Sequence, residues 1–264
     1  MIVDAHCHLV PTREGRECTL ARMNESGVDV TVLVPGGMVP PLGMADFLRG
    51  REPLITQDPP NQFMLETVRE FPGQFTAFFH VDPAFHDEAD FEGAVADGFC
   101  GFKLSPLVNR VAFADHGVQM LCAFAQAFEK PLYTHVVAAG DASLDALEPL
   151  LRAYPRLPLI LGHMGFAGTD ASAIRLARRY DNLFLETSVG SFAAIDEAAQ
   201  RLGPNKILFG SEGPVHHPGA ELKKLELLRL PSSAMERICG DNIKALIKFA
   251  ESGVSHEQLQ FSAV

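Results

Sequence analysis

Short apolar runs alternate with longer amphipathic segments along almost the whole chain. Eight of the runs predict buried strands, because each is a near-continuous series of apolar residues, many of them β-branched or aromatic. These runs are IVDAH (2–6), VDVTVLV (28–34), FTAFFHV (75–81), GFKLS (101–105), PLYTHV (131–136), PLILGH (158–163), LFLETS (183–188) and KILFGS (206–211). Between the runs, apolar side chains recur at helical spacing, as at Leu144, Leu147 and Leu151.

The spacing of the strands predicts how they are connected. Successive strands begin 23 to 30 residues apart, with a single longer interval of 47 residues. Each interval fits a strand followed by the crossover helix that joins parallel strands. Eight such units predict an α/β fold, the (β/α)8 TIM barrel, with the active site at the C-terminal ends of the strands. A doubly wound open sheet is the alternative, but it usually has fewer strands and a glycine-rich first turn.

The length fits one domain spanning residues 1–264, since eight units of 33 residues account for the whole chain. The long interval contains a loop rich in Pro and Gly at 34–61, which follows the second strand and could be a binding loop or a plain surface loop. Residues 219–251 predict two helices that close the barrel, and residues 252–264 predict a frayed tail.

Composition excludes several classes of partner. The net charge is 22 − 33 = −11, which argues against nucleic acid or an anionic membrane surface as a partner. No apolar run approaches the ~18 residues of a membrane span, and the N-terminus lacks the pattern of a secretory signal. The five cysteines form no C-x-x-C pair, so we expect reduced thiols in a cytoplasmic protein. We expect a small-molecule substrate, and a homodimer is left open.

Three polar residues alternate along the first predicted strand. Asp4, His6 and His8 lie at positions i, i+2 and i+4, so in a regular strand they share one face while Cys7 points to the other. Three buried polar groups on one face need a bound ion or a dense hydrogen-bond network. Two imidazoles two residues apart can reach one ion, so this motif predicts a metal site.

Four later strands offer a charged or metal-ligating residue at the same level of the barrel. His135 and His163 end the fifth and sixth strands, Lys103 lies in the fourth, and Glu212 follows the eighth. Each histidine alone would more often be a hydrogen-bonded core residue. Together they predict a cluster at the C-terminal mouth of the barrel.

Five motifs follow one another along the chain: DAHCH near residue 4, GFK at 101–103, TH at 134–135, GHMG at 162–165 and LFGSEGP at 208–214. This ordered set resembles the amidohydrolase superfamily. The chain is most similar to the amidohydrolase-related branch, which includes lactonases of dicarboxylate catabolism and the aminocarboxymuconate-semialdehyde decarboxylase type. The resemblance covers nearly the whole chain and implies the same barrel fold.

The resemblance implies a set of metal ligands. His6, His8 and His135 would hold a divalent ion, and Asp4 would ligate it or orient a neighbour. His163 would be a further ligand or the residue that polarises the substrate. We expect Zn²⁺, given nitrogen and oxygen ligands, and one ion rather than two.

Two positions on other strands bear on the chemistry. Lys103 lies where some relatives carry a carboxylated lysine that bridges two metals, and as a cation it could instead bind a substrate carboxylate. Glu212 stands where the family usually has Asp, and its extra methylene extends the carboxylate by about 1.5 Å. Glu212 could still ligate the ion or act as the general base. The site could also be remodelled or silent.

Several residues near the expected mouth complete the set. Arg49 and Arg51 in the long loop could help Lys103 to hold a substrate carboxylate. His216 and His217 on the eighth loop are either a solvated pair or substrate contacts. His80, at the end of the third strand, could face the mouth, although a hydrogen-bonded structural role is the simpler interpretation.

The reaction we expect is metal-dependent hydrolysis. Glu212 would take a proton from water that attacks a lactone, ester or amide carbonyl, and His163 would help to polarise that carbonyl. The alternative is a metal-dependent lyase that decarboxylates an unsaturated or aromatic acid. A second alternative is a metal-binding relative without catalysis.

Overall fold

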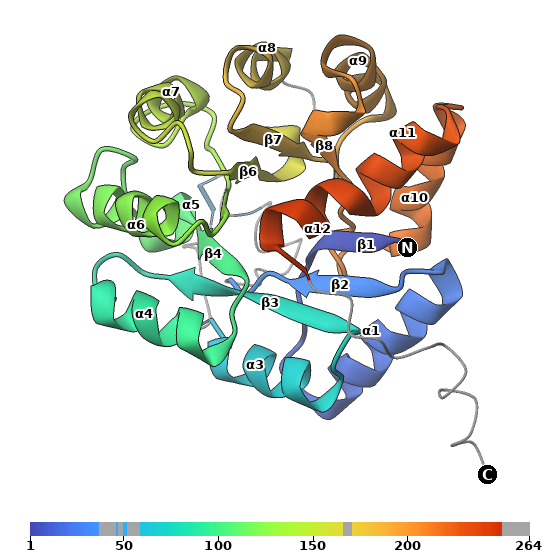
Figure 1. The fold of residues 1–264 in the computed structure, drawn as a ribbon, viewed down its shortest axis with the longest axis horizontal. Coiled ribbons are helices and arrows are strands. Elements are labelled where there is room, and N and C mark those ends of the chain that lie inside the picture. The colour runs from blue at the N-terminus through green and yellow to red at the C-terminus, as the bar shows by residue number, and fades with distance from the viewer. Residues whose placement is uncertain (37–45, 47–49, 52–58, 166–170, 250–264) are drawn as a thin grey trace.

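Eight parallel strands lie side by side in chain order and surround a central core, with helices on the outside (Figure 1). The computed structural model describes residues 1–36, 46, 50–51, 59–165 and 171–249. Most of the predicted loop 34–61 and all of the predicted tail 252–264 lie outside these residues. The strands are β1 (Val3–Cys7), β2 (Val30–Leu33), β3 (Phe75–Val81), β4 (Gly101–Leu104), β5 (Leu132–Thr134), β6 (Leu159–Leu161), β7 (Leu183–Glu186) and β8 (Ile207–Leu208).

The barrel closes between its first and last strands. The backbone of Ala5 donates to the carbonyl of Phe209 at 2.9 Å, and Ser211 and Glu212 both donate to the carbonyl of His6, at 3.1 and 2.8 Å. A parallel bridge joins Cys7 to Gly213. The segment after β8 therefore continues the sheet alongside β1, and the predicted (β/α)8 barrel is confirmed.

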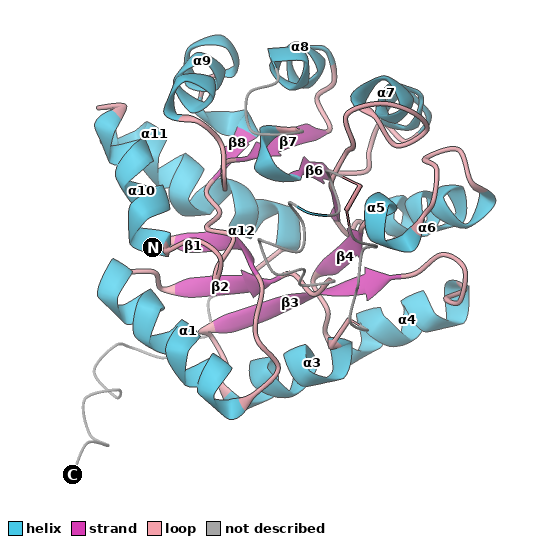
Figure 2. Ribbon diagram, turned by 180° about the vertical axis from the view of Figure 1, so that it is seen from behind, coloured by secondary structure: helices cyan, strands magenta, loops and turns pink. Residues whose placement is uncertain are grey.

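Most of the described helices form an outer ring around the strands (Figures 1 and 2). The described helices are α1 (Arg13–Ser26), α3 (Asn61–Glu70), α4 (Glu88–Asp97), α5 (Pro106–Asn109), α6 (His116–Ala127), α7 (Leu144–Ala153), α8 (Ala171–Arg179), α9 (Phe192–Leu202), α10 (Pro218–Leu227), α11 (Ser232–Glu236) and α12 (Asn242–Ile247). Short 3₁₀ turns lie at η1 (Gly162–Met164) and η3 (Pro204–Lys206), and a π turn, η4 (Arg237–Asp241), joins α11 to α12. Local signals set several helix ends, as where the Asp87 side chain caps α4 in a capping box.

The predicted elements form, but several strands are shorter than the apolar runs. The eighth run spans 206–211, and only Ile207–Leu208 is strand, because the chain then bends toward β1. The two predicted closing helices correspond to α10 and to the segment from α11 to α12. Among the described residues, no helix is long and apolar enough to cross a membrane.

The hydrophobic core has two layers, and the inner layer shows which end of the barrel is covered by α12. Apolar side chains between strands and helices form the larger cluster, as expected for a sheet that is covered on its outer face. A smaller cluster fills the barrel, where Val3 and Phe78 pack with Ile243 and Ile247 of α12. Because α12 covers this end, polar side chains beyond Phe78 and Tyr133 lie toward the opposite, C-terminal mouth.

Candidate metal centre and active site

Strand β1 is irregular, and the irregularity decides which of its polar residues meet. The register with β2 shifts between Asp4 and Cys7, which marks a bulge. Asp4 and Cys7 line one small cavity against α1, together with Arg22 and Met23. The prediction that Asp4 shares a face with His6 and His8 is therefore wrong, because the bulge interrupts the alternation of side chains.

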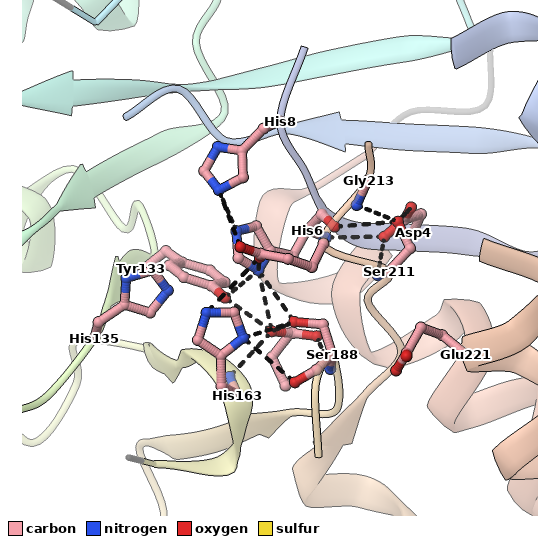
Figure 3. A network of polar contacts seen from close by, with 12 residues as sticks. Asp4, His6, His8, Tyr133, His135, His163, Ser188, Ser211, Gly213 and Glu221 are labelled. Carbon is pink, nitrogen blue, oxygen red and sulfur yellow. Dashed lines mark hydrogen bonds and ion pairs between the residues drawn. The ribbon is translucent and has the colours of Figure 1, made fainter. Parts of the chain in front are cut away.

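Asp4 instead joins the first strand to the segment after the eighth. Its carboxylate accepts hydrogen bonds from the Ser211 amide at 2.8 Å, from the Ser211 hydroxyl at 2.5 Å and from the His6 amide at 3.1 Å. Figure 3 shows Asp4 turned toward Ser211 and Gly213, away from the histidines. Burial raises the pKa of Asp4 to about 7, against the lowering effect of the Ser211 hydroxyl. This geometry fits the orienting role among the two roles expected for Asp4.

His6, His8 and Glu212 converge at the mouth. The Nε2 atoms of His6 and His8 are 3.3 Å apart. Glu212 places Oε1 3.5 Å from His8 Nε2 and Oε2 3.0 Å from His6 Nδ1. These three side chains form one of the two groups of described residues that could hold a metal ion.

His135 and His163 complete the second such group with His6. Their rings stack with centroids 4.5 Å apart, and the His163 ring lies 5.3 Å from that of His6. His163 Nε2 is 3.7 Å from Glu212 Oε2. Four histidines, from β1, from the loop just beyond β1 and from the ends of β5 and β6, thus gather at the mouth (Figure 3), and three of them, His6, His8 and His163, contact the Glu212 carboxylate.

Two separations between candidate donor atoms match the spacing of ligands around a single ion. Ligands bound tetrahedrally at about 2.0–2.1 Å lie about 3.3–3.4 Å from one another. The 3.3 and 3.5 Å separations at His8 Nε2 are close to this value. Glu212 Oε2 and His8 Nδ1 are buried with no hydrogen-bond partner within the described part of the chain. Nitrogen and carboxylate donors in this arrangement fit a divalent cation such as zinc.

A buried carboxylate on β7 organises two of the histidines, and the sequence analysis did not single it out. Glu186 Oε2 accepts hydrogen bonds from the Tyr133 and Ser188 hydroxyls, both at 2.8 Å. Burial opposes ionisation of Glu186, but hydrogen bonding from His6 and the charges of His6 and His163 lower its pKa to about 2. Glu186 is therefore an ionised acceptor, and each hydroxyl uses its only hydrogen on it.

This assignment fixes the tautomers of both histidines. The Tyr133 oxygen lies 2.7 Å from His6 Nδ1, and the Ser188 oxygen lies 2.9 Å from His163 Nδ1. Because both hydroxyl hydrogens are already donated to Glu186, each hydroxyl oxygen accepts from a hydrogen on the histidine Nδ1. The same His6 Nδ1 lies 3.3 Å from Glu186 Oε2 and 3.0 Å from Glu212 Oε2. With the hydrogen on Nδ1, a neutral ring keeps its lone pair on Nε2, as metal ligation requires.

A signal for these supporting residues was present in the sequence. Tyr133 precedes His135 by two positions, and Glu186 precedes Ser188 by two. Both pairs repeat the spacing of His6 and His8, with polar residues at inward positions of apolar strands. Glu186 in particular is a charged residue inside the apolar run LFLETS.

The electrostatics of the cluster hold Glu212 ionised. Burial opposes its charge, yet His6, His8 and His163 together keep the pKa of Glu212 well below its usual range. Burial likewise favours neutral His6, but the Glu212 and Glu186 carboxylates raise the pKa of His6 to about 9. A cation bound between these groups would take the place of that proton.

Lys103 lies where the sequence predicted, at the edge of the cluster. Its Nζ is 3.1 and 3.3 Å from the two ring nitrogens of His135, and 4.3 Å from the centre of the Tyr133 ring. The side chain is completely buried, and burial lowers the pKa of Lys103 to about 7, with Glu212 and Glu186 opposing the shift. Lys103 is thus a buried amine beside the histidines.

The other predicted substrate contacts have partners outside the histidine cluster or are not described. Arg51 is exposed and pairs with Asp46 at 3.2 Å, and Arg49 lies outside the described residues. The His217 side chain caps α10 by accepting from the Gly219 amide at 3.2 Å. His216 is partly exposed, with Nδ1 3.7 Å from the Glu221 carboxylate.

Both residues expected to act in catalysis have an unusual backbone. His163 and Glu212 have φ of 57° and 59°, in the left-handed region that non-glycine residues seldom adopt. Such conformations cost of order 1–3 kcal/mol and cluster at functional sites. At Glu212, the hydrogen bond that the backbone amide donates to the His6 carbonyl holds this turn in place.

A parallel barrel with a histidine and carboxylate cluster at its C-terminal mouth defines a class of metal-dependent enzymes. Within that class, residues 3–249 match the amidohydrolase family model, so the chain belongs to the amidohydrolase family. Comparison with curated protein sequences finds no match.

Solved structures share the fold at low sequence identity. An uncharacterized TIM-barrel protein from Bordetella bronchiseptica has a TM-score of 0.74 and 17% identity, covering 94% of this chain and 98% of that one. A probable 2-pyrone-4,6-dicarboxylic acid hydrolase from Acinetobacter baumannii, with citric acid bound, has a TM-score of 0.68 and 16% identity, covering 94% of this chain and 99% of that one. The 5-carboxyvanillate decarboxylase from Novosphingobium aromaticivorans, complexed with manganese and a nitrobenzoic acid, has a TM-score of 0.66 and 15% identity, covering 94% of this chain and 96% of that one.

Proposed function

We propose that this chain is a metal-dependent hydrolase that opens a lactone, ester or amide bond in a small substrate bearing a carboxylate. The observation that carries the proposal is the position of Glu212. Its carboxylate lies 3.0, 3.5 and 3.7 Å from nitrogen atoms of His6, His8 and His163. One carboxylate in contact with all three can help to hold an ion and accept a proton beside it.

One divalent ion is expected, held by His6, His8, Glu212 and His135, with His163 as a further donor. Both candidate groups of ligands contain His6, which supports one shared location rather than two separate sites. Zinc suits these nitrogen and oxygen donors, and the manganese in the similar decarboxylase makes manganese the main competitor. When bound, such an ion lowers the pKa of water and polarises a carbonyl oxygen.

The protein groups around the ion divide the proton chemistry. Glu212 is ionised and so accepts the proton of the attacking water, then returns it to the leaving oxygen or nitrogen. His163, whose Nδ1 is held by Ser188, keeps Nε2 facing the same space. It helps to position or polarise the carbonyl. Tyr133 and Glu186 hold His6 in the tautomer that ligates.

Lys103 is the side chain best placed to bind a carboxylate of the substrate. It lies beside His135 at the same mouth, and its charge is buried. Arg51, exposed and paired with Asp46, is less suited to this role.

Decarboxylation is the second candidate. It rests on the similarity to decarboxylases that act on aromatic acids. The same ion and the same lysine would bind an aromatic carboxylate, with a proton delivered to carbon in place of attack by water. Hydrolysis is preferred because Glu212 is held ionised, as a proton acceptor requires, whereas a donor to carbon must first be protonated.

The test uses metal-loaded protein and a panel of small lactones, esters and aromatic carboxylic acids. Ring opening or ester cleavage without release of CO₂ is the expected result, and Glu212→Gln lowers the rate at least 100-fold while the protein stays folded. Release of CO₂ from an acid, without cleavage of any lactone or ester, would replace the proposal by the lyase. Activity that survives complete removal of metal would reject both.

A further inference from the structure

His80 is a buried histidine at the mouth of the barrel, 1% exposed. Within the described residues, neither of its ring nitrogens has a hydrogen bond. In this part of the chain, the ring therefore lacks the hydrogen bonds of the structural role expected for His80. A buried polar group left unpaired costs about 1–3 kcal/mol, so its retention needs another explanation.

The ring of His80 points to the inside of the barrel. In β3 it lies two residues beyond Phe78, which belongs to the inner core, so both side chains face inward. In the sheet, His80 pairs with Lys103 of β4, and Lys103 pairs with Tyr133 of β5. His80, Lys103 and Tyr133 thus form one inward-facing row that leads to the metal-ligating histidines.

Both ends of the long segment between β2 and α3 meet at His80. At its start, a Cβ placed on Gly36 would lie 3.1 Å from His80 Cδ2, 3.6 Å from His80 Nε2 and 3.5 Å from the Ser105 hydroxyl. At its end, the Asn61 side chain donates to the His80 carbonyl at 3.0 Å and accepts from the His80 amide at 2.9 Å. Asn61 therefore binds the backbone of His80 and leaves the hydrogen-bonding groups of the ring unused.

The groups around this position are suited to an anionic oxygen. Lys103 supplies a buried amine that can carry a positive charge beside an anion, and the His80 ring and the Ser105 hydroxyl supply hydrogen-bond donors. Burial, together with the nearby charges of Lys103, His86 and His8, lowers the pKa of His80 to about 3, so the ring is neutral and donates one hydrogen. Charge from the lysine and directed hydrogen bonds from neutral groups are a common combination for holding a carboxylate.

We propose that His80, Ser105 and Lys103 form the subsite that binds the substrate carboxylate, with His80 as its specificity-determining residue. The proposal rests on the proposed function, since it places the acid group of that substrate on the β3 and β4 side of the metal. The bond that reacts then lies toward Glu212 and His163, on the opposite side.

The experiment measures binding of malonate, succinate and isophthalate to metal-loaded protein by titration calorimetry, for wild type and His80→Phe. We expect at least one probe to bind wild type and to bind His80→Phe at least tenfold more weakly, with unchanged metal content. We also expect an unchanged or raised melting temperature, because the substitution removes an unpaired polar group. A histidine with a structural role would instead lower the melting temperature.

His86→Phe is the matched control, because His86 has a partner. Its Nδ1 accepts from the Asp82 amide at 3.0 Å, so this variant should bind the probes as wild type does and lose some stability. Equal probe affinity in wild type and His80→Phe would overturn the proposal, as would a wild type that binds none of the three. Either result leaves metal content and hydrolysis unaffected, so failure of the subsite is distinguishable from failure of the proposed function.

Discussion

Glu212 contacts His6 twice, once through the backbone and once through the side chain. The Glu212 amide donates to the His6 carbonyl at 2.8 Å, and its carboxylate Oε2 lies 3.0 Å from His6 Nδ1. The same contact that closes the barrel between its first and last strands thus sets the distance between the carboxylate and the first histidine of the candidate metal centre. The glutamate side chain, one methylene longer than that of aspartate, reaches the site from a turn whose position the backbone hydrogen bond fixes.

Shortening this side chain should therefore harm the enzyme, although the family resemblance implies Asp at this position. Glu212→Asp withdraws the carboxylate by about 1.5 Å, and a misplacement of about 1 Å can cost about 100-fold in rate. We expect kcat/KM to fall between tenfold and 100-fold on the best substrate of the panel. Glu221→Asp, the same change at a buried carboxylate paired with Lys224, is the control. A gain of activity in Glu212→Asp would instead mark the wild type as a silent relative.

The hydroxyl of Tyr133 should matter for metal binding without touching the ion. Tyr133→Phe removes the oxygen that accepts from His6 Nδ1, and losses of such supporting hydrogen bonds typically weaken metal affinity about 10- to 100-fold. Competition with a chromophoric chelator measures the dissociation constant. Tyr154→Phe removes a hydroxyl that bonds Gln119, away from the site, and should leave the affinity unchanged. Equal affinities in the two variants would show that Tyr133 does not position His6.

Gly162 should tolerate no side chain. A Cβ there would lie 2.3 Å from the Tyr133 hydroxyl and 2.6 Å from His135 Cδ2, so Gly162→Ala must displace both. Overpacking of this kind typically costs about 1–3 kcal/mol. Gly93→Ala is the control, because Gly93 is exposed in α4 with nothing within 4 Å, and alanine there should stabilise by about 0.5–1 kcal/mol. Urea unfolding separates the two cases, and similar unfolding midpoints would contradict this packing.

Acid should destabilise the protein partly through His80. Its pKa is 6.5 as a free side chain and about 3 in the fold, chiefly because of burial, so only the unfolded chain takes up this proton between those values. The stabilisation from neutral His80 is complete above pH 6.5 and is lost as the pH falls toward about 3. Urea unfolding should show that the free energy of unfolding of His80→Phe, relative to that of wild type, is larger at pH 4 than at pH 7. A constant difference would contradict the buried, neutral ring.

Much of the fold was predictable because it rests on repeated local patterns. Near-continuous apolar runs at regular spacing predicted all eight strands, and the order of His6, His135, His163 and Glu212 predicted that they meet at one mouth. In a closed parallel barrel, residues at the C-terminal ends of strands converge whatever their separation in the chain.

The features that were predicted wrongly or overlooked are ones that the alternation of side chains along a strand does not encode. The bulge in β1 turned Asp4 toward Ser211, since one extra residue reverses the facing of those before it. Glu186 and Tyr133 were overlooked because their value depends on hydrogen bonds between β5 and β7, strands that are not adjacent. His217 was left open between a solvated residue and a substrate contact, and its role as a helix cap was not foreseen because it is set by where α10 begins.

The metal content of the purified protein decides whether the mouth of the barrel is a metal centre. Mass spectrometry of the purified protein, after dialysis against zinc or manganese and removal of free ion, should find about one equivalent per chain. His6→Ala and His8→Ala should lose most of it, while Asp4→Asn, which alters a residue bonded to Ser211, should keep it. A wild type without bound metal, or a His6→Ala/His8→Ala double variant that retains a full equivalent, would contradict the metal centre described above.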